Sequence, residues 1–161
     1  MMEFHDDAFW EWTMTLRIVQ LGSDRSPGEG LRIGTVRRPP RGVKKTEYAS
    51  KNFYDVWLPT LAPSAALVKL AQGAKSESEW DRFMKKYRAE MATPENRATL
   101  DLLAALSHRT DFSVGCYCSD ESRCHRSVLR ALLLARGAKV ALGRPCSAST
   151  ITGCSSQPGC C

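Results

Sequence analysis

The sequence predicts an α/β fold, in which a small, mainly parallel sheet is flanked by helices in a single compact three-layer domain. Short apolar segments typical of strands occur early and late in the chain, and segments with helical periodicity lie between them. Parallel strands need long connections, which the helical segments supply. At 161 residues, the chain is long enough for one domain with a sizeable core.

The domain is expected to span residues 13–143. Residues 1–12 show no clear period and stay unassigned, whereas residues 144–161 are rich in Ser, Gly, Thr and Cys, which indicates a disordered tail. The acidic start does not resemble a signal peptide, and no apolar run reaches membrane-spanning length. We therefore expect a cytoplasmic protein with reduced thiols and no membrane partner.

Two strands are predicted in the first part of the domain. Residues 13–21 and 31–36 are apolar runs bounded by turn-forming residues. Pro39 and Pro40 end the second strand because proline cannot donate a ladder hydrogen bond. Residues 45–57 mix aromatic and polar residues without a period, so we predict an irregular segment with one short strand.

Three helices are predicted in the middle of the chain. Ser64 is a suitable N-cap for a helix over residues 65–72, which Gly73 ends. Residues 76–79 have capping-box spacing, and the aromatic residues that follow at helical intervals are expected in the core. A third helix is predicted over residues 94–107 because proline suits the first helical position.

A strand, a helix and a final short strand complete the prediction. Residues 111–114 alternate in polarity and favour a strand, and residues 128–135 are apolar at all but one position and favour a buried helix. Residues 139–142 are apolar enough for a last strand. The intervening loop, residues 115–127, holds three of the seven cysteines and is the strongest indication of a site.

This loop brings thiols and positive charge together. In a strand, residues two apart lie on the same face, so Cys116 and Cys118 are expected to lie side by side. The next helix is expected to begin near Cys124 with Ser122 as its N-cap, so His125 and Arg126 lie where the helix dipole favours anions. The same environment lowers the pKa of a cysteine. We therefore predict Cys124, Cys116 and His125 as candidate catalytic residues.

Further basic residues follow the strand at residues 31–36. The net charge of +6 permits an anionic ligand or a nucleic acid, and composition alone does not choose between them. Ligands in α/β sheets bind beyond the carboxyl ends of strands, and arginine holds phosphate or carboxylate with two hydrogen bonds. We favour a small anionic ligand over nucleic acid, with Arg37, Arg41, Arg126 and Ser127 as its contacts.

Three interpretations of the cysteine cluster remain open. The cysteines can be buried apolar side chains without a function. Cys116, Cys118, Cys124 and His125 can also be counted as zinc ligands, but adjacent residues 124 and 125 would have to turn toward one ion, so we assign no metal ligand and expect little zinc. The favoured interpretation is a thiol-bearing loop that binds a phosphate or carboxylate group, as in cysteine phosphatases and rhodaneses, although the C-x4-R spacing up to Arg123 matches neither signature.

Several spaced motifs agree in order with one known family. They are Arg37 to Lys45, Trp57, Leu61-Ala62-Pro63-Ser64, the run from Trp80 to Met91, and Cys116 followed by Cys124-His125-Arg126. Together, over residues 31–137, they resemble the bacterial DUF488 family, which includes the YeaO-like proteins. The resemblance implies a compact α/β fold and no particular reaction. The YeaO-like branch differs, since it usually has Asp-Arg-Leu-Trp-Pro-Arg-Gly at residues 36–42 and often lacks the Cys-His-Arg run.

Overall fold

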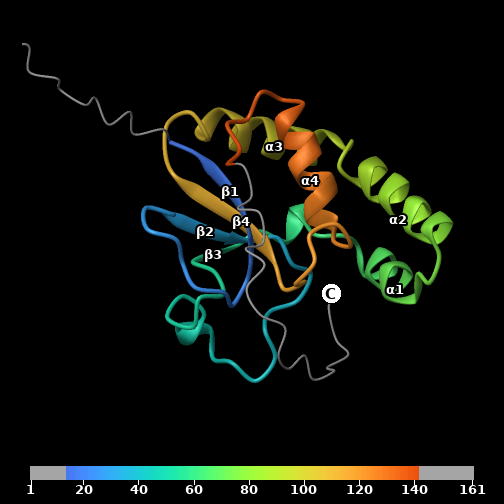
Figure 1. The fold of residues 1–161 in the computed structure, drawn as a ribbon, viewed down its shortest axis with the longest axis horizontal. Helices are drawn as coiled ribbons and strands as arrows, with labels where there is room; N and C mark the ends of the chain where they lie inside the picture. The colour runs from blue at the N-terminus through green and yellow to red at the C-terminus, as the bar shows by residue number, and fades with distance from the viewer. Residues whose placement is uncertain (1–13, 142–161) are drawn as a thin grey trace, which may run out of the picture.

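Four parallel strands form one sheet in the order β1-β4-β2-β3 (Figure 1). The computed structural model describes residues 14–141, so the predictions for residues 1–12 and 144–161 lie outside the described residues. The strands are β1 (Leu16–Gln20), β2 (Leu31–Gly34), β3 (Val56–Trp57) and β4 (Phe112–Cys116). The helices are α1 (Ala65–Gly73), α2 (Glu77–Glu90), α3 (Pro94–Leu106) and α4 (His125–Leu134), with short 3-10 turns η1 (Lys45–Glu47) and η2 (Pro59–Leu61). The predicted α/β class with a small parallel sheet is confirmed.

Three of these helices, α1, α2 and α3, begin where local sequence signals place them. The Ser64 side chain accepts a hydrogen bond from the backbone of α1, and Ser76 with Glu79 forms the predicted capping box of α2. Thr93 caps α3, with Pro94 at its first position. These contacts satisfy backbone N–H groups that have no partner within the helix, which is why the starts of these helices are predictable from the sequence.

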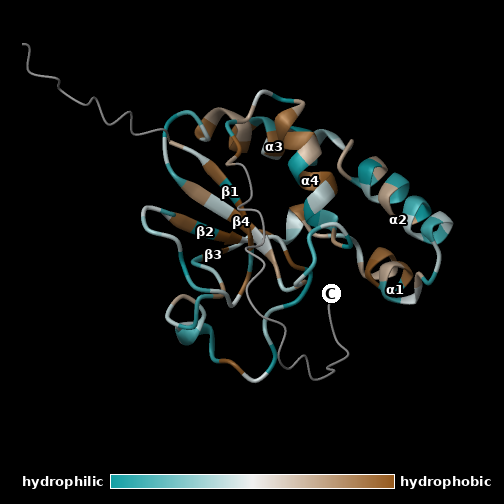
Figure 2. Ribbon diagram, in the orientation of Figure 1, coloured by the Kyte–Doolittle hydropathy of each residue, from teal (hydrophilic) through white to brown (hydrophobic). Residues whose placement is uncertain are grey.

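One face of the sheet is apolar and is covered by the helices. Leu16 of β1 and Val114 of β4 lie in the same buried cluster as Phe83 of α2 and Leu129 of α4. In Figure 1, α3 and α4 lie above the sheet, while α1 and α2 extend beyond the ends of its strands. Figure 2 shows hydrophobic residues concentrated in the strands and α1, and hydrophilic residues over much of α2.

The other face of the sheet is polar and is covered by loops. Arg32 of β2 is paired in register with Ser113 of β4, and both side chains are fully buried beneath the connection between β1 and β2. Gly30 allows this connection to come close, because it has a positive φ of 72° and a side chain there would collide with the backbone of Asp111. The third layer therefore consists of loops rather than of helices.

Two of the predicted strands are very short in the structure. The irregular segment at residues 45–57 contains η1 and ends in the two-residue β3, as predicted. The strand predicted at residues 139–142 is reduced, within the described part of the chain, to a single bridge between Val140 and Leu16. Leu16, at the start of β1, donates a backbone hydrogen bond to the Lys139 carbonyl and accepts one from the Ala141 N–H. Up to residue 141, this segment therefore pairs only with the first residue of β1.

β4 leads to the loop in which the sequence predicts a site. It lies between β1 and β2, all five of its residues are buried, and it ends at Cys116. The loop after β4 and the loop after β2 therefore open at the same edge of the sheet, which is where α/β folds bind ligands.

Candidate thiol and anion site at the end of β4

The site begins at the junction between β4 and α4. Cys124 is the N-cap residue of α4, with an extended backbone (φ −137°, ψ 151°), and its side chain makes no capping hydrogen bond. The predicted N-cap, Ser122, is wrong. Its backbone N–H and its hydroxyl both donate to the Asp120 carboxylate, at 2.8 and 2.7 Å, so this side chain is engaged within the loop two residues before the helix cap.

His125 is held in one orientation by the loop that follows β2. Its Nε2 lies 2.9 Å from the backbone oxygen of Thr35 and 3.4 Å from the hydroxyl of the same residue. The Tyr87 ring packs against the imidazole edge-to-face, with ring centroids 5.4 Å apart. With Nε2 directed to a carbonyl acceptor, Nδ1 faces the Cys124 sulfur at 3.7 Å.

Two thiols, those of Cys116 and Cys124, flank this imidazole ring, and a third, that of Cys118, contacts the Cys116 sulfur. The sulfurs of Cys116 and Cys118 are 3.7 Å apart, which confirms that they leave the end of β4 side by side. One ligand atom each from Cys116, Cys124 and His125 lies within 4.8 Å of the others, and all three residues are buried. Burial by itself lowers the pKa of His125, but hydrogen bonds and charge interactions with the Cys116 and Cys124 sulfurs raise it, to about 10 overall.

Adjacent Cys124 and His125 do turn toward one point. This is the geometry that the sequence showed a metal site would require, and it arises because the backbone changes from extended at Cys124 to helical at His125. This change brings two neighbouring side chains to the same side of the chain, where Cys116 meets them.

Arg126 lies beneath the loop and is 3% exposed. Its Nη2 donates to the backbone oxygen of Cys118 at 2.6 Å. Its Nε is buried and has no hydrogen-bond partner among the described residues. Ser127, also predicted to bind the ligand, donates its hydroxyl to the Cys124 carbonyl at 2.9 Å, so it closes the first turn of the helix.

The basic loop after β2 meets this site, but its arginines are used differently from each other. Arg37 donates from Nε to the Pro63 carbonyl at 2.9 Å and from Nη2 to the Ala62 carbonyl at 2.8 Å. Arg41 is exposed. The Tyr117 hydroxyl donates to the backbone oxygen of Arg38 at 3.1 Å, which ties the loop after β4 to the loop after β2.

The acidic residues of the loop are compensated. Glu121 accepts two hydrogen bonds from the guanidinium of Arg130, at 2.5 and 3.0 Å. Asp120 is bound by Ser122, whose hydroxyl and backbone N–H are the first two causes of its lowered pKa. From the sequence alone, two carboxylates in this loop would be expected to repel an anion. That repulsion is weakened because the Glu121 charge is paired with Arg130 and the Asp120 charge is exposed to solvent.

Sequence reasoning missed Thr35 as the residue that orients His125. The signal available was its position directly after β2, at the edge of the sheet where the cysteines were already placed. It also missed the role of Tyr87, which helical periodicity assigned to the core. Tyr87 is indeed fully buried, but it packs on the site through His125.

Within residues 14–141, no helix has the length and apolar character needed to cross a membrane. Residues 16–137 match the family model DUF488-N3a, described as the active DUF488-N3 subclade. No curated protein and no solved structure matches the chain. Because the matched segment covers well over half of the sequence, the chain belongs to the DUF488 family, in its DUF488-N3a subclade.

Proposed function

We propose that the protein binds a small molecule carrying a phosphate or carboxylate group at the loop between β4 and α4, with Arg126 as the principal contact. The thiols of Cys124 and Cys116, together with His125, lie beside this position and supply thiol-dependent chemistry. Arg37 holds the loop after β2 in place, and exposed Arg41 adds positive charge at the entrance.

The observation that carries this proposal is the buried Nε of Arg126, which has no hydrogen-bond partner within the described part of the chain. Arginine stays charged at any ordinary pH, and a buried charged donor without an acceptor is costly, at about 1–3 kcal/mol or more. An anion oxygen at Nε would supply an acceptor for this N–H group in a charge-assisted hydrogen bond. The N-terminus of α4, one residue away, adds N–H groups and a favourable dipole.

Two further observations support the same location. The site lies at the carboxyl edge of a parallel sheet, between the loops that follow two neighbouring strands. The description of the matched subclade as active is in keeping with a reactive group at this edge.

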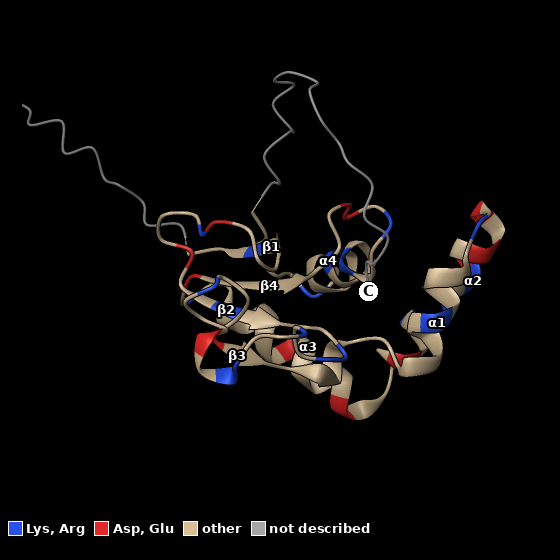
Figure 3. Ribbon diagram, turned by 90° about the horizontal axis from the view of Figure 1, so that it is seen from below, with Lys and Arg blue, Asp and Glu red and all other residues tan. Residues whose placement is uncertain are grey.

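A nucleic acid is less well supported as the partner. Lys and Arg positions are interspersed with Asp and Glu positions along the ribbon in Figure 3, rather than concentrated in one element that would present a continuous basic face. Binding to a phosphate backbone relies on such a face.

The direct test is a thermal-shift series with sodium phosphate, sulfate and acetate against chloride at matched ionic strength. Phosphate is expected to raise the melting temperature, because a ligand that binds only the folded state adds RT ln(1 + [L]/Kd) to the free energy of unfolding. The Arg126→Lys variant is expected to lose this increment, because an ammonium group cannot reproduce the planar fork of arginine.

Arg130→Lys is the matched control. It makes the same substitution one turn later in α4, where the guanidinium is fully engaged with Glu121 and the Ala141 carbonyl. This variant should respond to phosphate like the parent protein. Equal shifts with every anion, or an Arg126→Lys variant that responds like Arg130→Lys, would show that the site does not bind anions.

A further inference from the structure

We infer that Cys116, Cys124 and His125 form a binding site for a soft divalent cation such as zinc, with two sulfur ligands and one nitrogen ligand. This inference goes beyond anion binding and does not depend on it. It rests on the convergence of three ligand atoms, all within 4.8 Å of one another, from β4 and from the first turn of α4.

The distances are close to those of a loaded site. Zinc binds thiolate sulfur at about 2.3 Å and imidazole nitrogen at about 2.0–2.1 Å, so ligands in a tetrahedral shell lie roughly 3.5–3.8 Å apart. The Cys124 sulfur and His125 Nδ1 are already 3.7 Å apart. The remaining pairs need to close by at most about 1 Å, which side-chain rotation can supply without movement of the backbone.

The imidazole is oriented as a metal ligand is. Metal-binding histidines direct their second ring nitrogen to a carbonyl or carboxylate, which fixes the tautomer and leaves the first nitrogen for the ion. His125 Nε2 lies 2.9 Å from the Thr35 carbonyl oxygen, and Nδ1 is on the side of the thiols. Tyr87 packs on the ring and limits its rotation.

The charges also balance. Two thiolates neutralise a divalent cation, which matters because all three ligand residues are at most 3% exposed and a buried net charge is costly. The Cys118 sulfur touches that of Cys116 but is not one of the three converging atoms, so residues 14–141 supply three ligands to a tetrahedral ion.

The experiment uses the reduced, chelator-treated full chain in which Cys146, Cys154, Cys160 and Cys161 are replaced by Ser, so that thiols of the C-terminal segment cannot bind metal. This protein is titrated with Co²⁺ in chloride buffer without oxygen. We expect a thiolate-to-cobalt charge-transfer band and intense visible bands of a tetrahedral ion, which saturate at one equivalent and disappear when Zn²⁺ is added.

Matched variants locate the ligands. Cys116→Ser and His125→Asn are expected to lose or shift the bands, whereas Cys118→Ser and Arg126→Lys keep them. Circular dichroism shows whether each variant is folded. If a variant is unfolded, the cobalt titration of the parent chain decides whether the site binds metal. Absence of the bands from that chain overturns the proposal, and loss of the bands in Cys118→Ser overturns the three-ligand assignment. Because phosphate is absent and Arg126→Lys is included, failure here is distinct from failure of anion binding.

Discussion

At the scale of single residues, the site depends on contacts between segments that are far apart in the chain. Thr35 fixes the ring of His125, Tyr87 packs on it, and Cys116 approaches it from the end of β4. The residue types at residues 115–127 identified the candidate groups. Their convergence could not be predicted, because it depends on the register of β2 against β4 and on the backbone angles of Cys124.

The three thiols are expected to differ in reactivity. Cys116, Cys118 and Cys124 are all at most 3% exposed, so access is similarly restricted and the rate of alkylation reports the thiolate population. Cys124 lies at the N-terminus of α4 and 3.7 Å from His125 Nδ1, so in metal-free protein it should react several-fold faster than Cys118. Iodoacetamide labelling of the folded chain, followed residue by residue with mass spectrometry, measures this ratio.

The His125→Asn variant provides the control for this measurement. It removes the imidazole beside Cys124 and should bring the rate for that thiol down to the rate for Cys118. Uniformly slow labelling of all three cysteines in the parent protein would instead indicate buried thiols without a reactive role.

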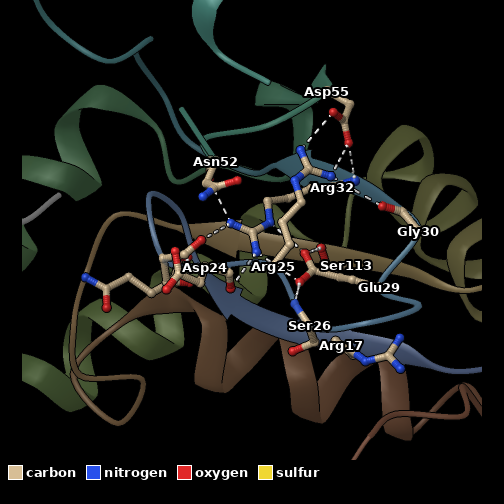
Figure 4. Close-up of polar contacts among 12 residues, drawn as sticks. Arg17, Asp24, Arg25, Ser26, Glu29, Gly30, Arg32, Asn52, Asp55 and Ser113 are labelled. Atoms are coloured by element: carbon tan, nitrogen blue, oxygen red, sulfur yellow. Dashed lines mark hydrogen bonds and ion pairs between the residues drawn. The ribbon is translucent and has the colours of Figure 1, made fainter. Parts of the chain in front are cut away.

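At the scale of elements, the connection between β1 and β2 is held on the sheet by a buried ion pair. Arg32 donates from Nε and Nη2 to the Glu29 carboxylate at 2.6 and 2.9 Å, and Ser113 of β4 donates to the same carboxylate at 2.7 Å (Figure 4). Arg32 also donates to the Asn52 carbonyl at 2.7 Å, which adds the segment before β3. This network covers the polar face of the sheet without a helix.

Glu29 should make stability depend on acid pH. Burial alone raises the pKa of Glu29, but hydrogen bonds from Arg32 and Ser113 and from a backbone N–H outweigh it, so the pKa is lowered overall. Its stabilising contribution is therefore complete above the ordinary carboxyl pKa of about 4 and is lost as the pH falls through the lower folded value. Glu29→Gln is expected to lower stability at neutral pH by roughly 3 kcal/mol and to flatten the acid dependence.

Urea unfolding of both proteins as a function of pH measures this effect. Glu47→Gln is the comparison, because its carboxylate pairs with Lys51 at the surface and should contribute little. A Glu29→Gln profile parallel to that of the parent protein at every pH would contradict the assigned role of this carboxylate.

Elements with local signals were predictable, and those determined by distant contacts were not. The capping box of α2 and the proline at the start of α3 lie within four residues of the backbone groups they affect. The N-cap of α4 was predicted incorrectly because the Ser122 hydroxyl bonds to Asp120 and not to the backbone of the helix. A serine can make either of these short-range hydrogen bonds, and the sequence does not distinguish them. The helix-free face of the sheet depends on the pairing of Glu29 with Arg32, which the sequence showed only as two charges three residues apart.

At the scale of the whole molecule, strand order explains why the site is where it is. Because β4 lies between β1 and β2, the thiol-bearing loop and the basic loop meet at one edge of the sheet. Tyr117 and Thr35 join the two loops at this edge through Arg38 and His125, and the helices cover the face behind it. The family match spans the strands and helices that build this edge, residues 16–137.

The most direct test of the central claim is a crystal structure of the reduced protein grown with phosphate. We expect a phosphate ion at the loop between β4 and α4, with one oxygen within hydrogen-bonding distance of Arg126 Nε and others near the first backbone N–H groups of α4. A structure in which Arg126 Nε remains without an anion, while phosphate binds elsewhere or nowhere, would contradict it.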